Sequence, residues 1–385
     1  GVQGTGDSDG DTFDTRLQAR FSTGSVDHVA LLGWDWQRAE WEGVRSAMSN
    51  PPPIDIFNPV YAAYRPTVAS EAPTGGVNCQ SGVYLQDQLS VGNWRLTVGG
   101  RYDWTKDDTS SSTRNLATGV AQLTGRSVIK SDAFTGRAGL LYTSESGFTP
   151  YISYAESFQP STTSPLNNIN GEAFEPVTGK QWEAGVKYQP ARIDGLVTLS
   201  VFDLRQQNLI TQDPNPDNDT CGANGTTRCS IQDGEGRVRG VELEGRVTPT
   251  QGFSLIGAAA WMDSEMTRSD QYLGKQLAMV PDYTASLWAD YTFSAGALEG
   301  LSLAAGARHN GVSYGDSANA FRIPSYTLFD AAIRYDVGRV GAGDLQLALN
   351  MSNLGDRRYV STCTTESSCY YGSGRTVQAT ARFGW

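Results

Sequence analysis

Apolar and polar residues alternate along most of this chain, which is the period of a β-strand. The pattern is clearest at the C-terminal end, where apolar residues at every second position from 377 to 385 share one predicted face. Thr, Gln, Arg and Gly occupy the other face. Segments of this kind predict strands at residues 12–22, 26–37, 81–91, 93–106, 131–143, 149–158, 178–189, 194–207, 235–248, 252–264, 282–293, 299–312, 324–337, 344–353 and 374–385.

The connections between these segments alternate between short and long. The short ones, such as 22–25, 91–92 and 190–193, are rich in Gly, Pro or Ser. The long ones are predicted loops at residues 38–80, 107–130, 159–177, 208–234, 265–281, 313–323 and 354–373. Short turns on one side and long loops on the other are typical of an outer-membrane barrel, whose long loops face outward. The predicted fold class is therefore all-β, a transmembrane antiparallel β-barrel, and a β-sandwich would not sort its loops so regularly.

The number of predicted strands indicates that more of the barrel exists elsewhere. With the long loops outside, the first and the last of the fifteen strands both descend toward the periplasm. Bacterial single-chain barrels have an even number of strands with both ends inside. The chain also starts without Met, in a stretch rich in Gly, Asp and Ser. We therefore expect residues 1–385 to be the C-terminal part of a larger barrel.

The composition is consistent with a barrel and argues against nucleic acid as a partner. Only 39% of the residues are hydrophobic, although 17 Tyr, 13 Phe and 9 Trp supply enough aromatics for two membrane-interface bands. No apolar run is long enough for a transmembrane helix. The formal charge of -11 argues against a nucleic-acid partner, because no basic tract could neutralise phosphates. On charge alone, an acidic soluble protein remains an alternative.

Four of the five cysteines form two close pairs in polar loops. The pairs Cys221–Cys229 and Cys363–Cys369 are predicted local disulfides, which implies an oxidising compartment. A metal site is disfavoured because no His lies near either pair and neither has the CxxC spacing. Cys79 is left without a predicted partner.

Histidine is too scarce for most catalytic or metal chemistry. The chain has two, His28 near a predicted periplasmic turn and His309 near an outer strand end. A protein-built iron site would need a His and carboxylate cluster, and a hydrolase would need an activated serine. We predict no enzyme activity and no metal site, and each His is expected to be an isolated residue of the lumen or the rim.

Eight sequence strings together resemble the TonB-dependent outer-membrane siderophore receptors, in particular the ferrichrome (ferric hydroxamate) type. Asn353-Leu-Gly-Asp-Arg-Arg-Tyr-Val360 resembles the family's Asn-Leu-Phe-Asp-x-x-Tyr signature, with Gly355 in place of Phe. The Cys363/Cys369 pair and the following Tyr370-Tyr371-Gly372 resemble the last extracellular loop of the ferrichrome type. The other strings are Gly82-Val-Tyr-Leu-Gln-Asp-Gln88, Gly99-Gly-Arg-Tyr-Asp-Trp104, Ser153-Tyr-Ala-Glu-Ser-Phe-Gln-Pro160, Gly179-Lys-Gln-Trp-Glu-Ala-Gly-Val-Lys-Tyr188, Arg239-Gly-Val-Glu-Leu-Glu244, Ser286-Leu-Trp-Ala-Asp-Tyr-Thr-Phe293 and Tyr314-Gly-Asp-Ser-Ala-Asn319.

The resemblance implies a 22-stranded barrel filled by an N-terminal plug, of which about fifteen strands and no plug are expected here. It implies active import of a ferric siderophore, energised by the TonB-ExbB-ExbD complex through a region outside this chain. The iron arrives chelated by the siderophore, so no cofactor is expected. The bacterial outer membrane is the implied location and its lipid a partner. A phage or colicin that docks on the loops is a further implied partner.

Such a ligand needs an outer vestibule with aromatic faces and a few hydrogen-bond donors. The resemblance suggests that aromatics of two loops line it, with Tyr64 and Tyr370 the first choices. The full set of candidate ligand-binding residues is Tyr64, Tyr61, Phe57, Trp41, Tyr370 and Tyr371. Each could instead serve loop packing or an aromatic band. Thr364 stands where the ferrichrome type has an aromatic, which leaves the exact siderophore open.

Three other functions stay open for such a barrel. The first is a passive porin-like channel, which would lack a plug. The second is a surface adhesin or phage-binding protein that uses the long loops for contact. An outer-membrane enzyme is the third and the least supported by the residues.

Overall fold

The computed structural model contains one large antiparallel sheet of fifteen strands, each paired with its neighbour in chain order. It describes all residues except 1, 49–54, 56, 58, 61–66, 115, 117–119, 216, 219, 223–227, 342, 366–367 and 385. The strands of the main sheet are β1 (Val2–Thr23), β2 (Val26–Met48), β3 (Val68–Val91), β4 (Trp94–Arg114), β5 (Ala121–Tyr142), β6 (Phe148–Gln159), β7 (Val177–Tyr188), β8 (Asp194–Gln212), β9 (Ser230–Thr250), β10 (Phe253–Arg268), β11 (Tyr283–Thr292), β12 (Leu301–Asn310), β15 (Tyr326–Val340), β16 (Gly343–Ser352) and β19 (Thr376–Gly384). The all-β prediction and the strand count are confirmed.

Two small hairpins stand outside the main sheet. They are β13 (Ser313–Tyr314) with β14 (Arg322–Ile323), and β17 (Val360–Thr365) with β18 (Ser368–Tyr371). The helical segments among the described residues are the short 3-10 turns η1 (Pro165–Asn167) and η2 (Gly296–Leu298). No helix in that part of the chain is long and apolar enough to cross a bilayer.

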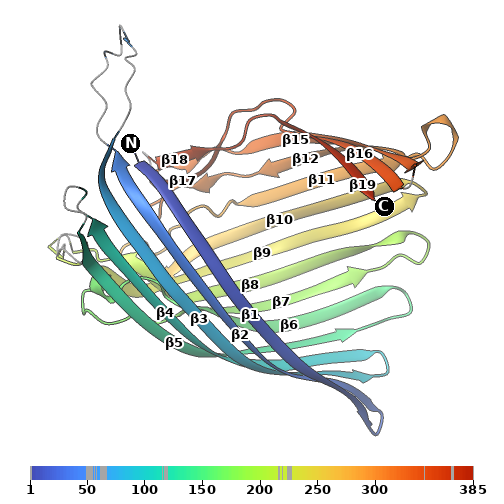
Figure 1. Cartoon of the computed structure of the whole chain (residues 1–385). Helices are drawn as coiled ribbons and strands as arrows, with labels where there is room; N and C mark the ends of the chain where they lie inside the picture. Colours follow the sequence, from blue (N-terminus) through green and yellow to red (C-terminus); the bar gives the residue numbers. More distant parts are fainter. Residues whose placement is uncertain are drawn as a thin grey trace.

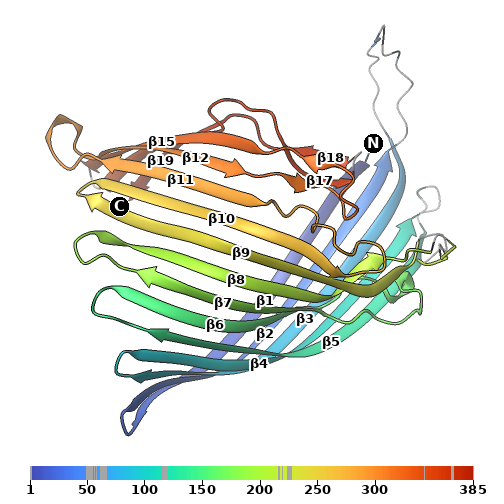
Figure 2. The same cartoon turned by 180° about the vertical axis from the view of Figure 1, so that it is seen from behind.

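The sheet curls into a deep trough, with β1 at one edge and β19 at the other (Figures 1 and 2). Tight turns close one end of the strands. In the β1–β2 and β3–β4 hairpins, two residues connect the strands, and Gly24 and Gly92 have φ of 63° and 53°. Two-residue hairpin turns need this left-handed backbone, which glycine adopts without strain. The short connections therefore lie where the sequence predicts them.

The two faces of each strand differ as the alternation predicts. Along β4, Trp94, Val98 and Trp104 share one face and are exposed, whereas Arg101 and Asp103 share the other. Trp94 and Trp104 are ten positions apart. This is about 33 Å along a strand and about 23 Å along the normal at a 45° tilt, close to the roughly 25 Å height of the apolar band of an outer-membrane barrel. Trp94 and Trp104 thus mark the two membrane interfaces on β4.

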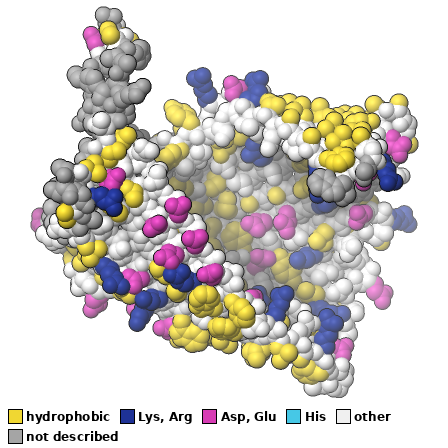
Figure 3. Space-filling model, viewed as in Figure 1, with side chains coloured by type: hydrophobic (Ala, Val, Ile, Leu, Met, Phe, Trp, Pro, Cys, Tyr) yellow, Lys and Arg dark blue, Asp and Glu magenta, His cyan; other side chains and the backbone are white. Residues whose placement is uncertain are grey.

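The opposite face lines the trough and is polar. Figure 3 looks into the hollow, and acidic and basic side chains lie on its wall. Ion pairs hold neighbouring strands together there, for example Arg308 on β12 with Asp330 on β15. The concave side is therefore a hydrated luminal wall, as expected for a barrel interior.

The predicted long loops are too long, because the strands continue past the alternating segments. β2 runs to Met48 and β3 begins at Val68, so 38–48 and 68–80 are strands and not parts of a loop. β4 and β5 likewise stay paired as far as Arg114 opposite Ala121. Beyond the membrane both faces of a strand meet water, so the backbone ladder continues without the alternation that lipid requires.

Candidate functional site

The candidate ligand-binding residues of the first long connection divide into three groups. Tyr61 and Tyr64 lie outside the described residues. Phe57 lies in the remaining loop, 92% exposed, and its backbone N–H donates to Asp55 Oδ1 at 2.8 Å. Trp41 is a correction, because it lies within β2 opposite Gly76 of β3 and not in a loop. Its ring is half-exposed and covers Gly76, where a Cβ would approach the indole Nε1 to 2.8 Å.

The last long connection contains the final hairpin, which we define as β17 and β18. Cys363 and Cys369 are directly opposite each other in its register and form a disulfide, and Cys363 is fully buried. Tyr370 and Tyr371 follow on β18 and are 58% and 79% exposed. Figure 1 places this hairpin at the end of the sheet where β2 ends and β3 begins. The hairpin thus presents two aromatic rings at the same end of the sheet as Phe57.

The base of this connection is closed by Asn353, whose side chain is 3% exposed. Its Nδ2 donates to the carbonyl oxygens of Arg357 (2.9 Å) and Ser373 (3.1 Å), and its Oδ1 accepts from the backbone N–H of Arg357 (2.9 Å). Asp356 Oδ1 adds a bond from the backbone N–H of Arg375 (2.8 Å). One amide therefore joins the start and the end of the segment 354–373. The sequence identifies Asn353 only as part of a signature and does not predict that its side chain closes the segment 354–373.

The rest of the signature packs beside that amide. The ring of Tyr359 packs against Tyr326, tilted by 35° with centroids 4.3 Å apart, and covers Gly372, where a Cβ would lie 1.9 Å from the Tyr359 ring. The backbone N–H of Gly372 donates to Tyr359 O (2.9 Å). The signature therefore anchors the hairpin through Tyr359. Tyr370 and Tyr371 take no part in the contacts among Tyr359, Tyr326 and Gly372.

Gly355 should accept the phenylalanine that the signature usually has. A Cβ built there meets no atom within 4 Å, and the backbone has no positive φ. We expect Gly355→Phe to change the free energy of unfolding by less than about 0.5 kcal/mol, as is usual for surface substitutions. Gly372→Ala is the contrasting variant, and it should destabilise the loop because its Cβ would overlap Tyr359. Urea titration of both variants in lipid vesicles measures the difference, and a Gly355→Phe loss as large as that of Gly372→Ala would contradict it.

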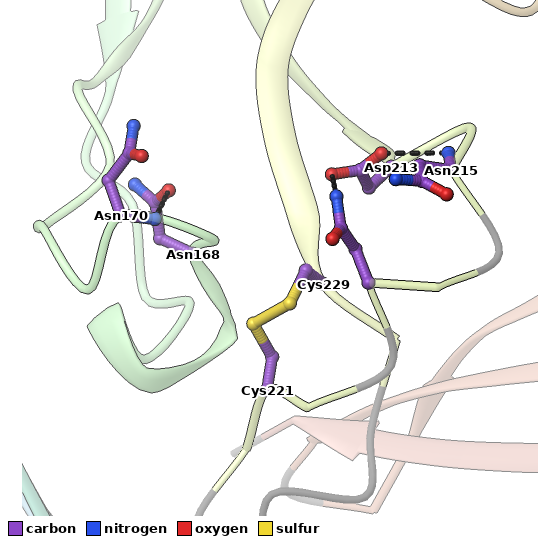
Figure 4. The surroundings of a disulfide bond; sticks show 7 residues. Asn168, Asn170, Asp213, Asn215, Cys221 and Cys229 are labelled. Atoms are coloured by element: carbon purple, nitrogen blue, oxygen red, sulfur yellow. Dashed lines mark hydrogen bonds between the residues drawn. A yellow bond between two sulfur atoms is a disulfide. The ribbon is translucent and has the colours of Figure 1, made fainter.

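The second disulfide, Cys221–Cys229, lies in the connection between β8 and β9 (Figure 4). Beside it Asp213 is 5% exposed and accepts from the backbone N–H of Asn215 and from Asn218 Nδ2, both at 2.8 Å. Asp213 N–H donates to Cys229 O at 2.9 Å. The buried carboxylate is therefore satisfied by its own loop. The structure contains both disulfides that the cysteine spacing predicts.

This loop also packs on the connection between β6 and β7. The backbone N–H of Gly222 donates to Leu166 O (2.7 Å), and Asn168 forms a bridge to Ser230. Gln232 Nε2 donates to the carbonyl oxygens of Glu175 (2.7 Å) and Asn208 (2.8 Å). Two loops far apart in the sequence therefore form one surface.

On the luminal wall, Arg101 of β4 crosses β3 to reach β2. Its guanidinium donates to Asp35, with Nη2–Oδ1 at 2.8 Å, and to Asp103, with Nε–Oδ2 at 2.7 Å. Asp103 is 2% exposed and also accepts from Gln80 Nε2 at 2.9 Å. The side chain passes over Gly82, where a Cβ would lie 2.0 Å from Nη2. Glycine at 82 is thus what allows the pair to form.

A second part of the wall forms a shallow hollow of about 390 Å³. Glu242 and Glu244 of β9 line one side of it, and Arg308 and Tyr326 line the other. In the described part of the chain, no three His, Cys, Asp or Glu side chains are placed to hold a metal ion. The wall can therefore offer hydrogen bonds and charges to a luminal occupant.

The two histidines lie on the lipid side of the sheet, so the expected luminal position is wrong, and they are far apart in the sheet order. His28 Nδ1 contacts Asp87 Oδ2 at 2.7 Å, and the ring stacks on Phe21. His309 stacks on Tyr283, and its Nδ1 contacts Thr327 Oγ1 at 2.8 Å. Neither is placed beside a serine in the arrangement of a hydrolase.

Beyond the membrane band, an ion pair ties the extensions of β4 and β5. Arg126 Nε and Nη2 each lie 3.0 Å from an oxygen of Asp108. The hydrogen bonds from Arg126, aided by Lys106, lower the pKa of Asp108 to about 2. The pair therefore stays charged at any physiological pH, and the extended ladder keeps this link.

Comparisons with known proteins agree on one family. The family described as "TonB dependent receptor-like, beta-barrel" matches residues 2–354. The chain is 39% identical over 382 residues to the ferrichrome outer membrane transporter/phage receptor of Escherichia coli (strain K12), covering 97% of the chain and 48% of that protein. It is 35% identical over 370 residues to the ferrioxamine B receptor of Salmonella typhimurium (strain LT2), covering 95% of the chain and 49% of that protein.

A solved structure agrees in fold. The siderophore receptor PiuA from Acinetobacter baumannii superposes with a TM-score of 0.75 at 24% identity, covering 98% of this chain and 56% of that one. At this identity the likeness concerns the fold alone. The chain spans about half the length of the curated relatives it matches.

Proposed function

Because the chain belongs to the TonB-dependent receptors, a family of β-barrels of the bacterial outer membrane, we propose that it imports a ferric hydroxamate siderophore. In this proposal residues 1–385 form the C-terminal part of a 22-stranded barrel that encloses a plug. The TonB complex supplies energy through a region outside the chain. Both relatives described above are named for hydroxamate siderophores, which supports this ligand class.

The final hairpin is the observation that carries the proposal. Its exposed Tyr370 and Tyr371 stand on a base fixed by a disulfide and by Asn353. Rigid aromatic rings provide contact area at little entropic cost, and a chelated iron needs no ligand from the protein. We propose that the two tyrosines bind the siderophore together with Phe57, Trp41, Tyr61 and Tyr64.

Uptake by an iron-starved strain that lacks the gene tests the substrate. Growth on ferrichrome or ferrioxamine B should depend on the gene, whereas growth on ferric citrate should not. Loss of TonB should abolish the dependent growth, and growth that persists would favour the passive channel. Unchanged growth of the deletion strain on every hydroxamate would refute the proposal.

Substitutions in the hairpin test the site. We expect Tyr370→Ala combined with Tyr371→Ala to raise the Kd for the siderophore about 10- to 100-fold, as for aromatic anchors of an interface. The double Phe variant keeps the rings and should stay within about threefold. Tyr335→Ala removes an exposed aromatic at the opposite membrane interface and serves as the matched control. Equal losses in Tyr335→Ala and the double Ala variant would assign the effect to folding and not to binding.

A further inference from the structure

The luminal wall and the final hairpin share a hydrogen-bonded connection that begins at Arg308. Its Nε and Nη2 donate to Asp330 Oδ2 (2.6 Å) and Oδ1 (3.0 Å) in a two-point pair between β12 and β15. The Arg308 side chain is 54% exposed to the luminal hollow, whereas that of Asp330 is 13% exposed. A planar guanidinium bound at two points fixes the orientation of a carboxylate more firmly than a single bond does.

The carboxylate of Asp330 accepts one further hydrogen bond, from the start of the connection that contains the final hairpin. Asp330 Oδ1 accepts from the backbone N–H of Asn353 at 2.9 Å. The neighbouring Leu354 N–H donates to Phe329 O at 2.8 Å, which holds the same turn against β15. Asn353 has a left-handed backbone with φ of 52°, a conformation that needs support from its surroundings. Asp330 supplies part of this support.

From Asn353 the connection continues to both ends of the hairpin segment. The amide bonds at Arg357 and Ser373 close the segment, which carries the disulfide, Tyr370 and Tyr371. Each member from Arg308 to Ser373 contacts the next directly. If Asp330 turned away, the N–H of a nearly buried residue would lose its acceptor, and such groups are costly to leave unpaired.

We propose that Arg308 and Asp330 are positioning residues for the final hairpin, through which the luminal wall sets the placement of Tyr370 and Tyr371. The assignment of a binding role to those tyrosines rests on the function proposed above. Neither Arg308 nor Asp330 has to touch the siderophore. Their effect reaches the ligand through Asn353.

The same wall provides a matched control. Arg334 of β15 donates to Asp290 of β11 across the intervening strand β12, which repeats the Arg–Asp chemistry on the same wall. The side-chain exposures, 48% and 17%, are close to those of Arg308 and Asp330. Within the described part of the chain, neither Arg334 nor Asp290 forms a hydrogen bond to residues 353–375.

Hydrogen exchange measured by mass spectrometry on the full-length receptor in outer-membrane vesicles tests the proposal. We expect Asp330→Ala and Arg308→Met each to speed exchange of peptides from 354–373 about tenfold, because local opening becomes easier. Asp290→Ala and Arg334→Met should leave these peptides within about twofold. Arg308→Met alters an exposed side chain, so it keeps the test meaningful if Asp330→Ala does not fold. Unchanged exchange in Arg308→Met, or equal acceleration in the Arg334→Met control, would overturn the proposal.

The Kd for ferrichrome and ferrioxamine B, measured on the same variants, separates this inference from the proposed function. Faster exchange together with an about tenfold weaker Kd supports both. Faster exchange with an unchanged Kd for each siderophore supports the positioning of the hairpin and refutes its role in binding. Arg308→Lys keeps the charge without the two-point geometry, so it should show an intermediate rate of exchange.

Discussion

Replacing Arg101 with methionine is expected to lower the free energy of unfolding by about 3 kcal/mol, the lower end of the range for breaking a buried ion pair. The lower end applies because the Arg101 side chain is 29% exposed to the lumen. The variant leaves Asp103, which is 2% exposed, and Asp35 without their cation. Urea titration of the barrel in lipid vesicles gives the free energy.

The matched control for that measurement is Arg239→Met. Arg239 pairs with Asp263 at 2.8 Å, but both side chains are nearly half exposed. Exposed pairs contribute at most about 1 kcal/mol, so this variant should be nearly neutral. Gly82→Ala should lower the free energy of unfolding about as much as Arg101→Met does, because the added Cβ displaces the guanidinium of Arg101. Equal losses for Arg101→Met and Arg239→Met would contradict the distinction between the two pairs.

Replacing Asn353 with alanine is expected to cost about 3 kcal/mol of local stability, since three buried hydrogen bonds are lost and their backbone partners stay behind. Part of the loss is backbone strain, because alanine tolerates a φ of 52° poorly. The effect should be confined to residues 354–373. Hydrogen exchange in that segment, compared with the hairpin formed by β13 and β14, measures it.

Two further variants at 353 separate the causes. Asn353→Gly keeps the backbone free to adopt its φ and removes the amide, so it should recover about 1 kcal/mol relative to alanine. Asn353→Asp keeps an acceptor for Arg357 N–H but loses both donors, so it should lie between alanine and the parent. A glycine variant as stable as the parent would show that the amide bonds contribute nothing.

Much of the fold can be predicted from the sequence because its rules are local. Alternation predicts which side chains of β4 face lipid and which face the lumen, and glycines such as Gly24 and Gly92 predict the tight turns. The close cysteine pairs predict their own disulfides because few residues separate the partners. The strand ends were predicted less well, because residues 38–48 and 68–80 place polar residues on both faces and do not keep one regular alternation.

The candidate site was less predictable. Tyr370 and Tyr371 could be selected because they follow a cysteine pair in a loop. Trp41 was assigned to a loop although it lies in β2. Asn353 could be noticed as the first residue of a signature. Its side chain bonds to backbone atoms of Arg357 and Ser373, however, and no sequence pattern predicts such partners. Arg308 and Asp330 carried no signal at all.

The sequence by itself determined the all-β class, the number of main-sheet strands and the identity of their two faces. Only the tertiary structure decided which charges meet across the sheet. Arg101 and Asp35 are 66 residues apart and pair because the registers of β2, β3 and β4 bring them together across Gly82. The link from Arg308 through Asp330 to Asn353 likewise depends on the pairing of β12, β15 and β16. The physical reason is that alternation has a period of two residues, whereas register is set by contacts among whole strands.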